Sequence, residues 1–202
     1  MPSLNQIKKV MIEIVSIDDI ADHICFFGGA IPYIVENKPS NREHSDIDVL
    51  VDEKYMQKLR RIVQKKYCYM PHQDSLNLGL DGDYGFKIFI GDVYVEFEPI
   101  SINDGVFTQR SFSLNSKKAG QQQIPFGRLE DIIIPFELDG KKTFVQSNEM
   151  IKASKSEFKR PKDIKDIKFI DDCGIDKEKY RRVQKALSNK TVNIFPYENF
   201  TM

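Results

Sequence analysis

The sequence has no tryptophan, only three cysteines and no net charge. Cys25, Cys68 and Cys173 are widely spaced, form no CxxC pair and are odd in number. This pattern favours neither a disulfide framework nor a zinc site, and it fits the reducing cytoplasm best. Thirty Lys and Arg residues balance thirty Asp and Glu residues. The chain therefore lacks the basic surplus with which general nucleic-acid binders hold phosphates.

Long apolar runs are also absent. No segment approaches the roughly 18 apolar residues of a membrane span, and the N-terminus has no apolar core of the signal-peptide type. The sequence contains no internal repeat and no GxxxxGK[ST] phosphate loop. Its three histidines stand in no recognisable relation to the cysteines, which argues against a His/Cys nucleophile. We expect a cytoplasmic protein with no membrane partner.

What is present is an ordinary globular composition. The chain has 202 residues, of which 41% are hydrophobic and 30% charged, enough for one well-cored domain with a small appendage. The composition shifts near Val145, and Ser147, Pro161 and Asp176 are suitable starts for three helices. We therefore predict a main domain over residues 1–145 and a helical C-terminal subdomain with a tail over residues 146–202.

Hydrophobic patterning and turn dipeptides predict the elements of the main domain. Helices are expected before His23, over residues 30–36 after a double glycine, and over residues 53–66 with Asp52 as the cap. Strands are expected over residues 24–27, 47–51, 75–80, 84–90 and 93–100, the last three as an antiparallel meander, and over residues 132–138 and 142–145 as a hairpin. The polar segment 117–123 is expected to be an exposed loop, and the segment after residue 190 an extended tail.

The residues with the clearest chemistry are Asp46 and Asp48. They lie two apart on a predicted strand, so both carboxylates leave the same face of the sheet. Magnesium prefers such hard oxygen ligands. Further along the chain, Glu96 and Glu98 also share one strand face, and two glutamates facing inward repel each other unless a cation compensates them. The residues therefore suggest a two-ion magnesium site that takes a third carboxylate from this strand, either Glu96 or Glu98.

Three segments carry a family resemblance: the double glycine, REHSDIDVLVD and VEFEPISINDGVFTQ. They resemble the polymerase-β nucleotidyltransferase superfamily, in particular the small bacterial lincosamide and aminoglycoside nucleotidyltransferases. The match runs from Gly28 to about Gln109 and is visible again, more weakly, in SNEMIKASKSEFKRPKDIKDIKFI. The resemblance implies an α+β fold with a polymerase-β-like core, in which a small mixed sheet has helices on one face, plus a helical C-terminal segment.

The resemblance also implies roles for individual residues. The catalytic and metal-binding residues would be Asp46, Asp48 and Glu96, with Glu96 deprotonating the acceptor hydroxyl. The nucleotide-binding residues would be Gly28, Gly29, Arg42, His44, Ser45 and Lys155, with Lys152 as the alternative lysine. The chain departs from the family pattern twice, because Glu96 replaces an aspartate and Glu98 stands where a histidine is common.

The expected activity is magnesium-dependent transfer of a nucleoside monophosphate from an NTP to a hydroxyl of a small molecule, such as an aminoglycoside or lincosamide antibiotic. Two alternatives stay open: a toxin-type nucleotidyltransferase that modifies tRNA or protein, and a catalytically silent nucleotide-binding module. Structural readings stay open as well. His44 could simply hold its loop by a hydrogen bond, and the charges between Lys152 and Lys168 could be a solvated helix pair with Asp163 and Asp166 as partners.

Overall fold

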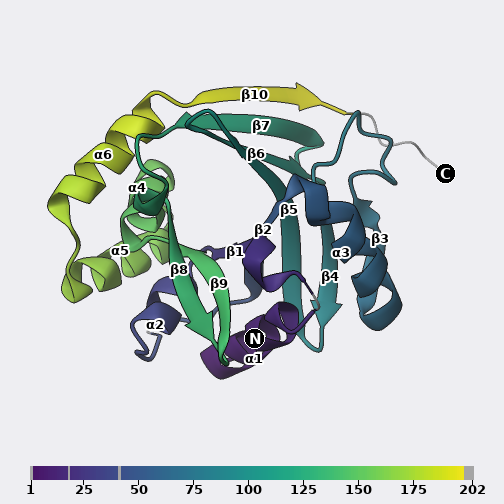
Figure 1. The fold of residues 1–202 in the computed structure, drawn as a ribbon, viewed down its shortest axis with the longest axis horizontal. Helices are drawn as coiled ribbons and strands as arrows, with labels where there is room; N and C mark the ends of the chain where they lie inside the picture. The colour runs from purple at the N-terminus through teal and green to yellow at the C-terminus, as the bar shows by residue number, and fades with distance from the viewer. Residues whose placement is uncertain (1, 18, 41, 198–202) are drawn as a thin grey trace.

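The computed structural model describes residues 2–17, 19–40 and 42–197. Within these ranges the chain is α+β, with six α-helices and a mixed ten-stranded sheet (Figure 1). The helices are α1 (Leu4–Val15), α2 (Ile31–Val35), α3 (Glu53–Lys66), α4 (Asn148–Phe158), α5 (Pro161–Cys173) and α6 (Lys177–Ser188). The strands are β1 (Ile24–Phe27), β2 (Asp46–Asp52), β3 (Cys68–Asp74), β4 (Phe86–Ile90), β5 (Val93–Asn103), β6 (Val106–Ser113), β7 (Lys118–Pro125), β8 (Ile133–Leu138), β9 (Lys141–Gln146) and β10 (Thr191–Pro196).

The strand order is β10-β7-β6-β5-β2-β1-β9-β8, and β4 pairs with both β5 and β3. At the centre, β2 runs parallel to β5, with Asp48 opposite Glu96. This parallel pair was not predicted, whereas the antiparallel pairing predicted for the strands over residues 84–90 and 93–100 is found between β4 and β5. The parallel pairing matters for function because it places the acidic positions of the two strands side by side on one face.

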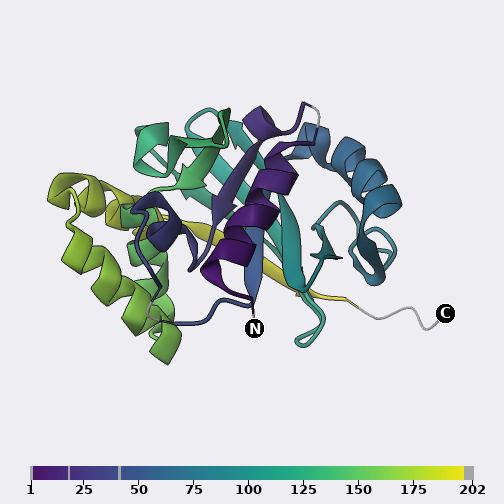
Figure 2. The ribbon, with the colours of Figure 1, turned by 90° about the horizontal axis from the view of Figure 1, so that it is seen from below.

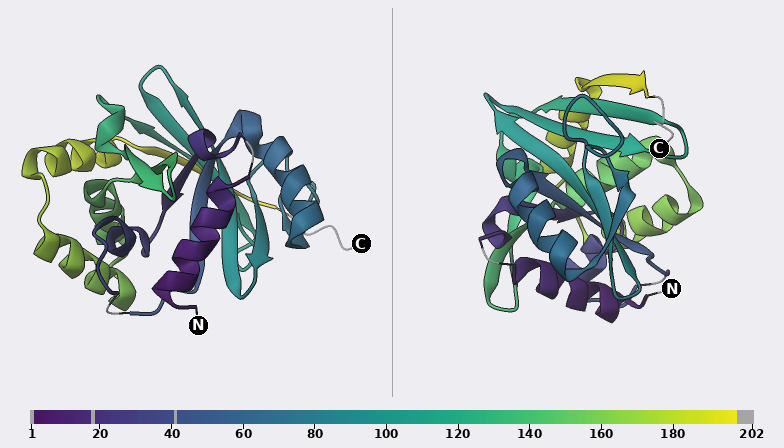
Figure 3. Two further views of the ribbon diagram at one scale, coloured as in Figure 1. Left: turned by 60° about the horizontal axis from the view of Figure 1, so that its bottom comes forward. Right: turned by 90° about the vertical axis from the view of Figure 1, so that its right-hand side faces the viewer.

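Helices pack on both faces of the sheet. The prediction that helices cover only one face was therefore wrong. Alternate residues of β2 point to opposite sides. Val49 belongs to the core beneath α1 and α3, whereas Leu50 joins a second core with Met150 of α4 and Leu187 of α6. Figures 2 and 3 show α1 and α3 side by side on one face, with α4, α5 and α6 grouped at one end of the sheet. The sheet is also larger than expected.

Several local predictions are confirmed. The strand at β1, the short helix α2 with Pro32 in its first turn, and the β8–β9 hairpin all form as expected. Helix α3 begins after Asp52, whose carboxylate accepts a hydrogen bond from the Lys54 amide at 3.1 Å. The three C-terminal helices begin after Ser147, at Pro161 and after Asp176.

The strand predicted over residues 75–80 is wrong, because this segment forms turns. The Asp74 carboxylate accepts a hydrogen bond from the Leu76 amide at 3.0 Å, and the Ser75 hydroxyl accepts one from the Tyr84 amide at 2.9 Å. These side chains offer the backbone an alternative to a strand ladder. The strand that pairs with β4 is instead β3, which precedes the turns.

Two polar or terminal segments also form strands against expectation. The segment 117–123, predicted as a loop, contributes most of β7, which pairs with β6 on one side. The predicted tail contributes β10, which pairs antiparallel with β7 from Thr191↔Gln123 to Pro196↔Lys118. The last part of that tail, residues 198–202, lies outside the described residues. Polar strands of this kind form here because neighbouring strands satisfy their backbone groups.

No helix in the described part of the chain has both the length and the apolar character needed to traverse a bilayer.

Candidate functional site

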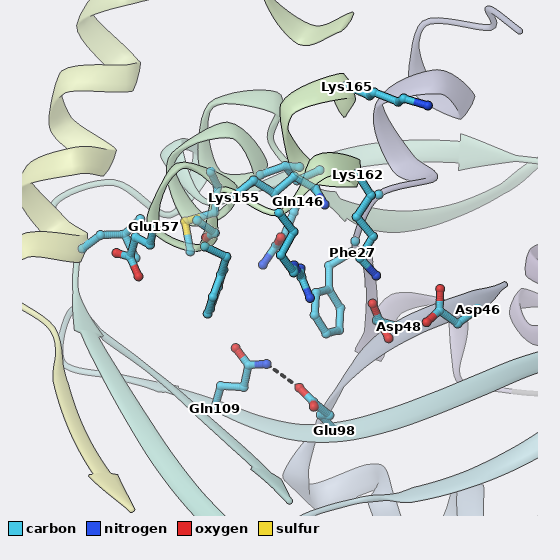
Figure 4. A pocket seen from close by; sticks show the side chains of 18 of the residues that line it. Phe27, Asp46, Asp48, Glu98, Gln109, Gln146, Lys155, Glu157, Lys162 and Lys165 are labelled. Carbon is cyan, nitrogen blue, oxygen red and sulfur yellow. Dashed lines mark hydrogen bonds between the residues drawn. The ribbon is translucent and has the colours of Figure 1, made fainter. Parts of the chain in front are cut away.

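A cavity of about 790 Å³ opens between the sheet and the C-terminal helices (Figure 4). Its walls come from the turn after β1, the strands β2, β5, β6 and β7, and the helices α4, α5 and α6. Seven of the nine predicted site residues line it: Gly28, Gly29, Arg42, Ser45, Asp46, Asp48 and Lys155. The structure thus brings together segments that are more than 100 residues apart in the sequence.

Asp46 and Asp48 leave the same face of β2 toward this cavity, as predicted from their spacing. Within the described residues, no hydrogen bond or ion pair holds either carboxylate. Burial and the negative charges of Asp46 and Glu96 raise the pKa of Asp48 to about 8. Two hard oxygen donors that repel each other and have no protein partner are suited to a divalent cation.

A complete metal cage is not preformed. Among the described residues, no three His, Cys, Asp or Glu side chains are gathered closely enough to hold a metal ion. This arrangement fits magnesium, which usually takes one or two carboxylates and fills its remaining positions with phosphate oxygens and water.

The double glycine approaches the acidic pair closely. Gly28 has φ +93°, and a Cβ at this position would lie 2.7 Å from Oδ2 of Asp48. A Cβ at Gly29 would lie 1.8 Å from a guanidinium nitrogen of Arg42. Only glycine fits at both positions, so the turn after β1 presents bare backbone beside the carboxylates.

The two glutamates of β5 have different surroundings. Glu96 lies beside Asp48 in the ladder, but its Oε1 is 3.0 Å from Nζ of Lys87 and it does not line the cavity. Glu98 does line the cavity, although it is only 8% exposed, and it accepts a hydrogen bond from Gln109. Burial and the charge of Glu96 raise the pKa of Glu98 well above its usual range.

Arg42 and Lys155 are both engaged with one buried aspartate. Arg42 donates two hydrogen bonds to Asp166, each 2.7 Å long, and Nζ of Lys155 lies 2.9 Å from the same carboxylate. Lys155 also contacts Asp163 at 3.0 Å. Although burial opposes ionisation, the hydrogen bond from Arg42 and the charge of Lys155 lower the pKa of Asp166.

The predicted helix pair with Asp163 and Asp166 as ion-pair partners is found, but these two partners are buried and not solvated, since both are 0% exposed. This network of ion pairs also shows that the two cations predicted to hold a triphosphate already have protein partners. Their ion pairs join α4 and α5 to the segment that precedes β2.

His44 is 3% exposed and does not line the cavity. Its Nε2 lies 2.7 Å from the Ser40 hydroxyl, and its ring meets that of Tyr33 edge-on. Burial and the nearby Arg42 charge lower the pKa of His44 to about 4. The structure therefore places His44 as a support of the segment before β2, whereas its neighbour Ser45 faces the cavity.

Because the folded pKa of His44 is below its unfolded value of about 6.5, protonation favours the unfolded chain. Stability from this group is complete above about pH 6.5 and is lost as the pH falls toward 4. We expect His44→Asn to reduce the loss of unfolding free energy between pH 7 and pH 5 by about 2 kcal/mol. Urea denaturation at both pH values measures this. The matched control is His72→Asn, which removes an exposed histidine instead of a buried one.

Other cavity residues were missed at the sequence level. Lys162 and Lys165 in the first turns of α5 line the cavity, and no ion pair engages either within the described residues. Figure 4 shows the Lys162 side chain pointing toward Asp48, and its charge acts to lower the pKa of that carboxyl. Three amides, Gln109, Gln122 and Gln146, were missed as well. For Gln122 the available signal was the run of glutamines at 121–123, which was instead predicted to be a loop.

Comparison with known proteins gives a fold but no family. No family model and no curated protein matches the sequence. Among solved structures, the lincosamide antibiotic adenylyltransferase LnuA bound to lincomycin matches with 18% identity and a TM-score of 0.55, covering 82% of this chain and 95% of that one. An antigenic nucleotidyltransferase-like protein from Paracoccidioides brasiliensis matches with 16% identity and a TM-score of 0.46, covering 93% of this chain and 86% of that one. The likeness to LnuA shows that this chain has a nucleotidyltransferase-like fold.

Proposed function

We propose that this protein is a magnesium-dependent nucleotidyltransferase that moves a nucleoside monophosphate from an NTP to a hydroxyl of a small compound. The observation that carries the proposal is the pair Asp46 and Asp48. Both carboxylates face the cavity without a protein partner, beside a glycine turn that exposes backbone. The lincomycin bound by LnuA is a small hydroxylated antibiotic, and an acceptor of that kind suits the cavity volume of about 790 Å³.

The metal would be held by Asp46 and Asp48, with Glu96 as the third carboxylate. Glu96 lies directly across the β2–β5 ladder from Asp48. When bound, magnesium ions neutralise charge on the triphosphate and help to activate both the attacking and the leaving oxygen. The protein's own contribution is to place these carboxylates on two neighbouring central strands, β2 and β5.

The triphosphate would lie along the glycine turn, with Lys162 and Lys165 as its cationic contacts. These lysines face the cavity and are not engaged in ion pairs within the described residues. Arg42 and Lys155 also line the cavity, but Asp166 already neutralises part of their charge. We assign them chiefly a positioning role, since Arg42 packs directly against Gly29.

Transfer to a hydroxyl requires a base for its proton. We assign this role to Glu96. Burial raises the pKa of Glu96, and the ion pair with Lys87 acts against that rise. A carboxylate with a raised pKa accepts a proton more readily than an ordinary one, as a general base must. Catalysis would then consist of positioning and electrostatic stabilisation of an in-line displacement.

The test uses NTPs labelled either at the α- or at the γ-phosphate, incubated with the protein, Mg²⁺ and an acceptor panel of lincomycin, an aminoglycoside and tRNA. We expect the α-label to move to the acceptor and the γ-label to leave as pyrophosphate. Transfer of the γ-label would indicate a kinase and contradict the proposal. Labelling of tRNA alone would favour the toxin-type activity, and NTP binding without any transfer would favour a silent module.

A further inference from the structure

Three charged side chains form a row across neighbouring strands in the middle of the sheet. Asp48 is the Cα partner of Glu96 in the β2–β5 ladder, and Lys87 is the Cα partner of Glu96 in the β4–β5 ladder. Strand β5 lies between β2 and β4 (Figure 1). Residues opposite each other in a ladder point to the same face of the sheet. Glu96 therefore has an aspartate of the proposed metal site on one side and a lysine on the other.

Lys87 is a buried cation that is paired with this glutamate. It is 9% exposed, and its Nζ lies 3.0 Å from Oε1 of Glu96, the acid with which it forms an ion pair within the described residues. The same Nζ lies over the rings of Tyr94 and Phe112, 5.7 and 5.2 Å from their centroids. Aromatic faces attract a cation but do not neutralise it. Glu96 is therefore the group that compensates the buried charge of Lys87.

This ion pair bears on the third carboxylate of the proposed metal site. Asp46 and Asp48 line the cavity, whereas Glu96 does not. In addition to burial, the negative charges of Asp46 and Glu96 raise the pKa of Asp48, because the three carboxylates repel one another. Lys87 offsets this repulsion from the side of β4, and a divalent cation held by Asp46 and Asp48 would offset it from the cavity. Two cations that share one carboxylate also repel each other, so each weakens the other's interaction with Glu96.

We propose that Lys87 is a positioning residue that holds Glu96 as its counter-ion, and that a divalent cation bound by Asp46 and Asp48 competes with Lys87 for Glu96. This inference rests on the proposed function, because it concerns the third carboxylate of the same site. Lys87 does not line the cavity, so it acts through Glu96 and not on the substrates. The protein should consequently bind a free divalent cation more weakly than its three carboxylates alone would allow.

The experiment measures the Kd for Mn²⁺ by electron paramagnetic resonance, which detects the free ion. Mn²⁺ is the probe because it takes oxygen ligands, as Mg²⁺ does. The protein of 202 residues is compared, without NTP, as wild type, Lys87→Met, Glu96→Gln and the double variant. We expect Lys87→Met to lower the Kd about 10-fold when Glu96 is present, because Glu96 is released to the cation. In the Glu96→Gln background the same substitution should lower the Kd by no more than about 3-fold, since it then removes only a distant positive charge.

Lys162→Met is the matched control for the loss of a positive charge. The charge of Lys162 acts to lower the pKa of Asp48, but this lysine forms no ion pair within the described residues. Its removal should tighten Mn²⁺ binding by the same factor with and without Glu96→Gln, because it releases no carboxylate.

An equal effect of Lys87→Met in both backgrounds, weaker Mn²⁺ binding by Lys87→Met, or no Mn²⁺ binding by any of the four forms would overturn the inference. Loss of Lys87 leaves Glu96 buried without its cation. Lys87→Gln, which keeps a hydrogen-bond donor, is therefore made as a second variant with the same expected direction, and circular dichroism establishes that each variant is folded.

The outcome is separable from that of the transfer assay. Transfer of the α-label, together with equal effects of Lys87→Met in both backgrounds, would contradict this inference alone. Coupling between Lys87 and Glu96 in Mn²⁺ binding, without transfer of any label, would contradict the proposed function alone.

Discussion

Replacing Asp48 with asparagine is expected to lower kcat/KM by about 10²–10³-fold, the scale seen when a group that stabilises developing charge is removed. Asparagine keeps the shape of the side chain but loses the negative charge that a divalent cation needs. Asp48 lies close to the Gly28 backbone, since a Cβ added at Gly28 would lie 2.7 Å from Oδ2, and asparagine is chosen because it does not enlarge the side chain. Initial rates with a labelled NTP over a range of acceptor concentrations measure the effect.

The same substitution is expected to stabilise the metal-free protein. The pKa of Asp48 is raised to about 8 by burial and by Asp46 and Glu96, so the neutral form is preferred in the folded state. Folding stability is therefore lost as the pH rises from about 4 to 8, while the unfolded chain ionises freely. At pH 8, Asp48→Asn should raise the free energy of unfolding by an amount on the order of 3 kcal/mol. A variant that is both inactive and more stable would show that Asp48 serves function and lowers the stability of the metal-free fold.

Asp92→Asn is the matched control, because Asp92 lies exposed in the β4–β5 turn, far along the strand from the acidic positions. It should change neither the rate nor the stability appreciably. Undiminished label transfer by Asp48→Asn would remove the metal assignment, whatever its effect on folding.

The chemical groups of the site were easier to predict from the sequence than the ion pairs and strand pairings that surround them. The Asp46/Asp48 spacing and the double glycine were sufficient to place two carboxylates on one strand face beside a turn. These are local features, set by the period of a strand and by the freedom of glycine. The hairpin turn at Asp139-Gly140 was predictable for the same reason, since both residues adopt positive φ, 52° and 74°.

Features that depend on distant partners were not predictable. A lysine on a charged helix reads as solvated, yet Lys155 is 8% exposed because Asp163 and Asp166 compensate it. Similarly, glutamines 121–123 form a strand because β6 and β10 pair with it from both sides. No local pattern reveals that Lys162, rather than a neighbouring lysine, points toward Asp48. Burial and pairing across the fold decide these points.

The second large effect concerns the buried ion pairs around Asp166. Its carboxylate accepts two hydrogen bonds from Arg42, lies 2.9 Å from Nζ of Lys155, and accepts a third hydrogen bond from the Tyr33 hydroxyl at 3.2 Å. Asp166→Asn should destabilise the protein by about 3–5 kcal/mol. Lys155 would keep its ion pair with Asp163, but Arg42 would lose the acid that it pairs with among the described residues. For a chain of this size, the melting temperature should fall by roughly 10 °C. Urea denaturation and thermal unfolding measure both quantities.

Asp19→Asn is a fair comparison for this change. It removes the same charge from an ion pair with Lys58, but there the side chains are 45% and 78% exposed, and asparagine tolerates the positive φ of 55° at residue 19. Its cost should not exceed about 1 kcal/mol. If Asp166→Asn costs no more than this control, the network does not hold α5 to the segment before β2. A much larger cost, together with a rise in KM for the NTP, would show that Arg42 supports the glycine turn through Asp166, because Arg42 is the group against which Gly29 packs.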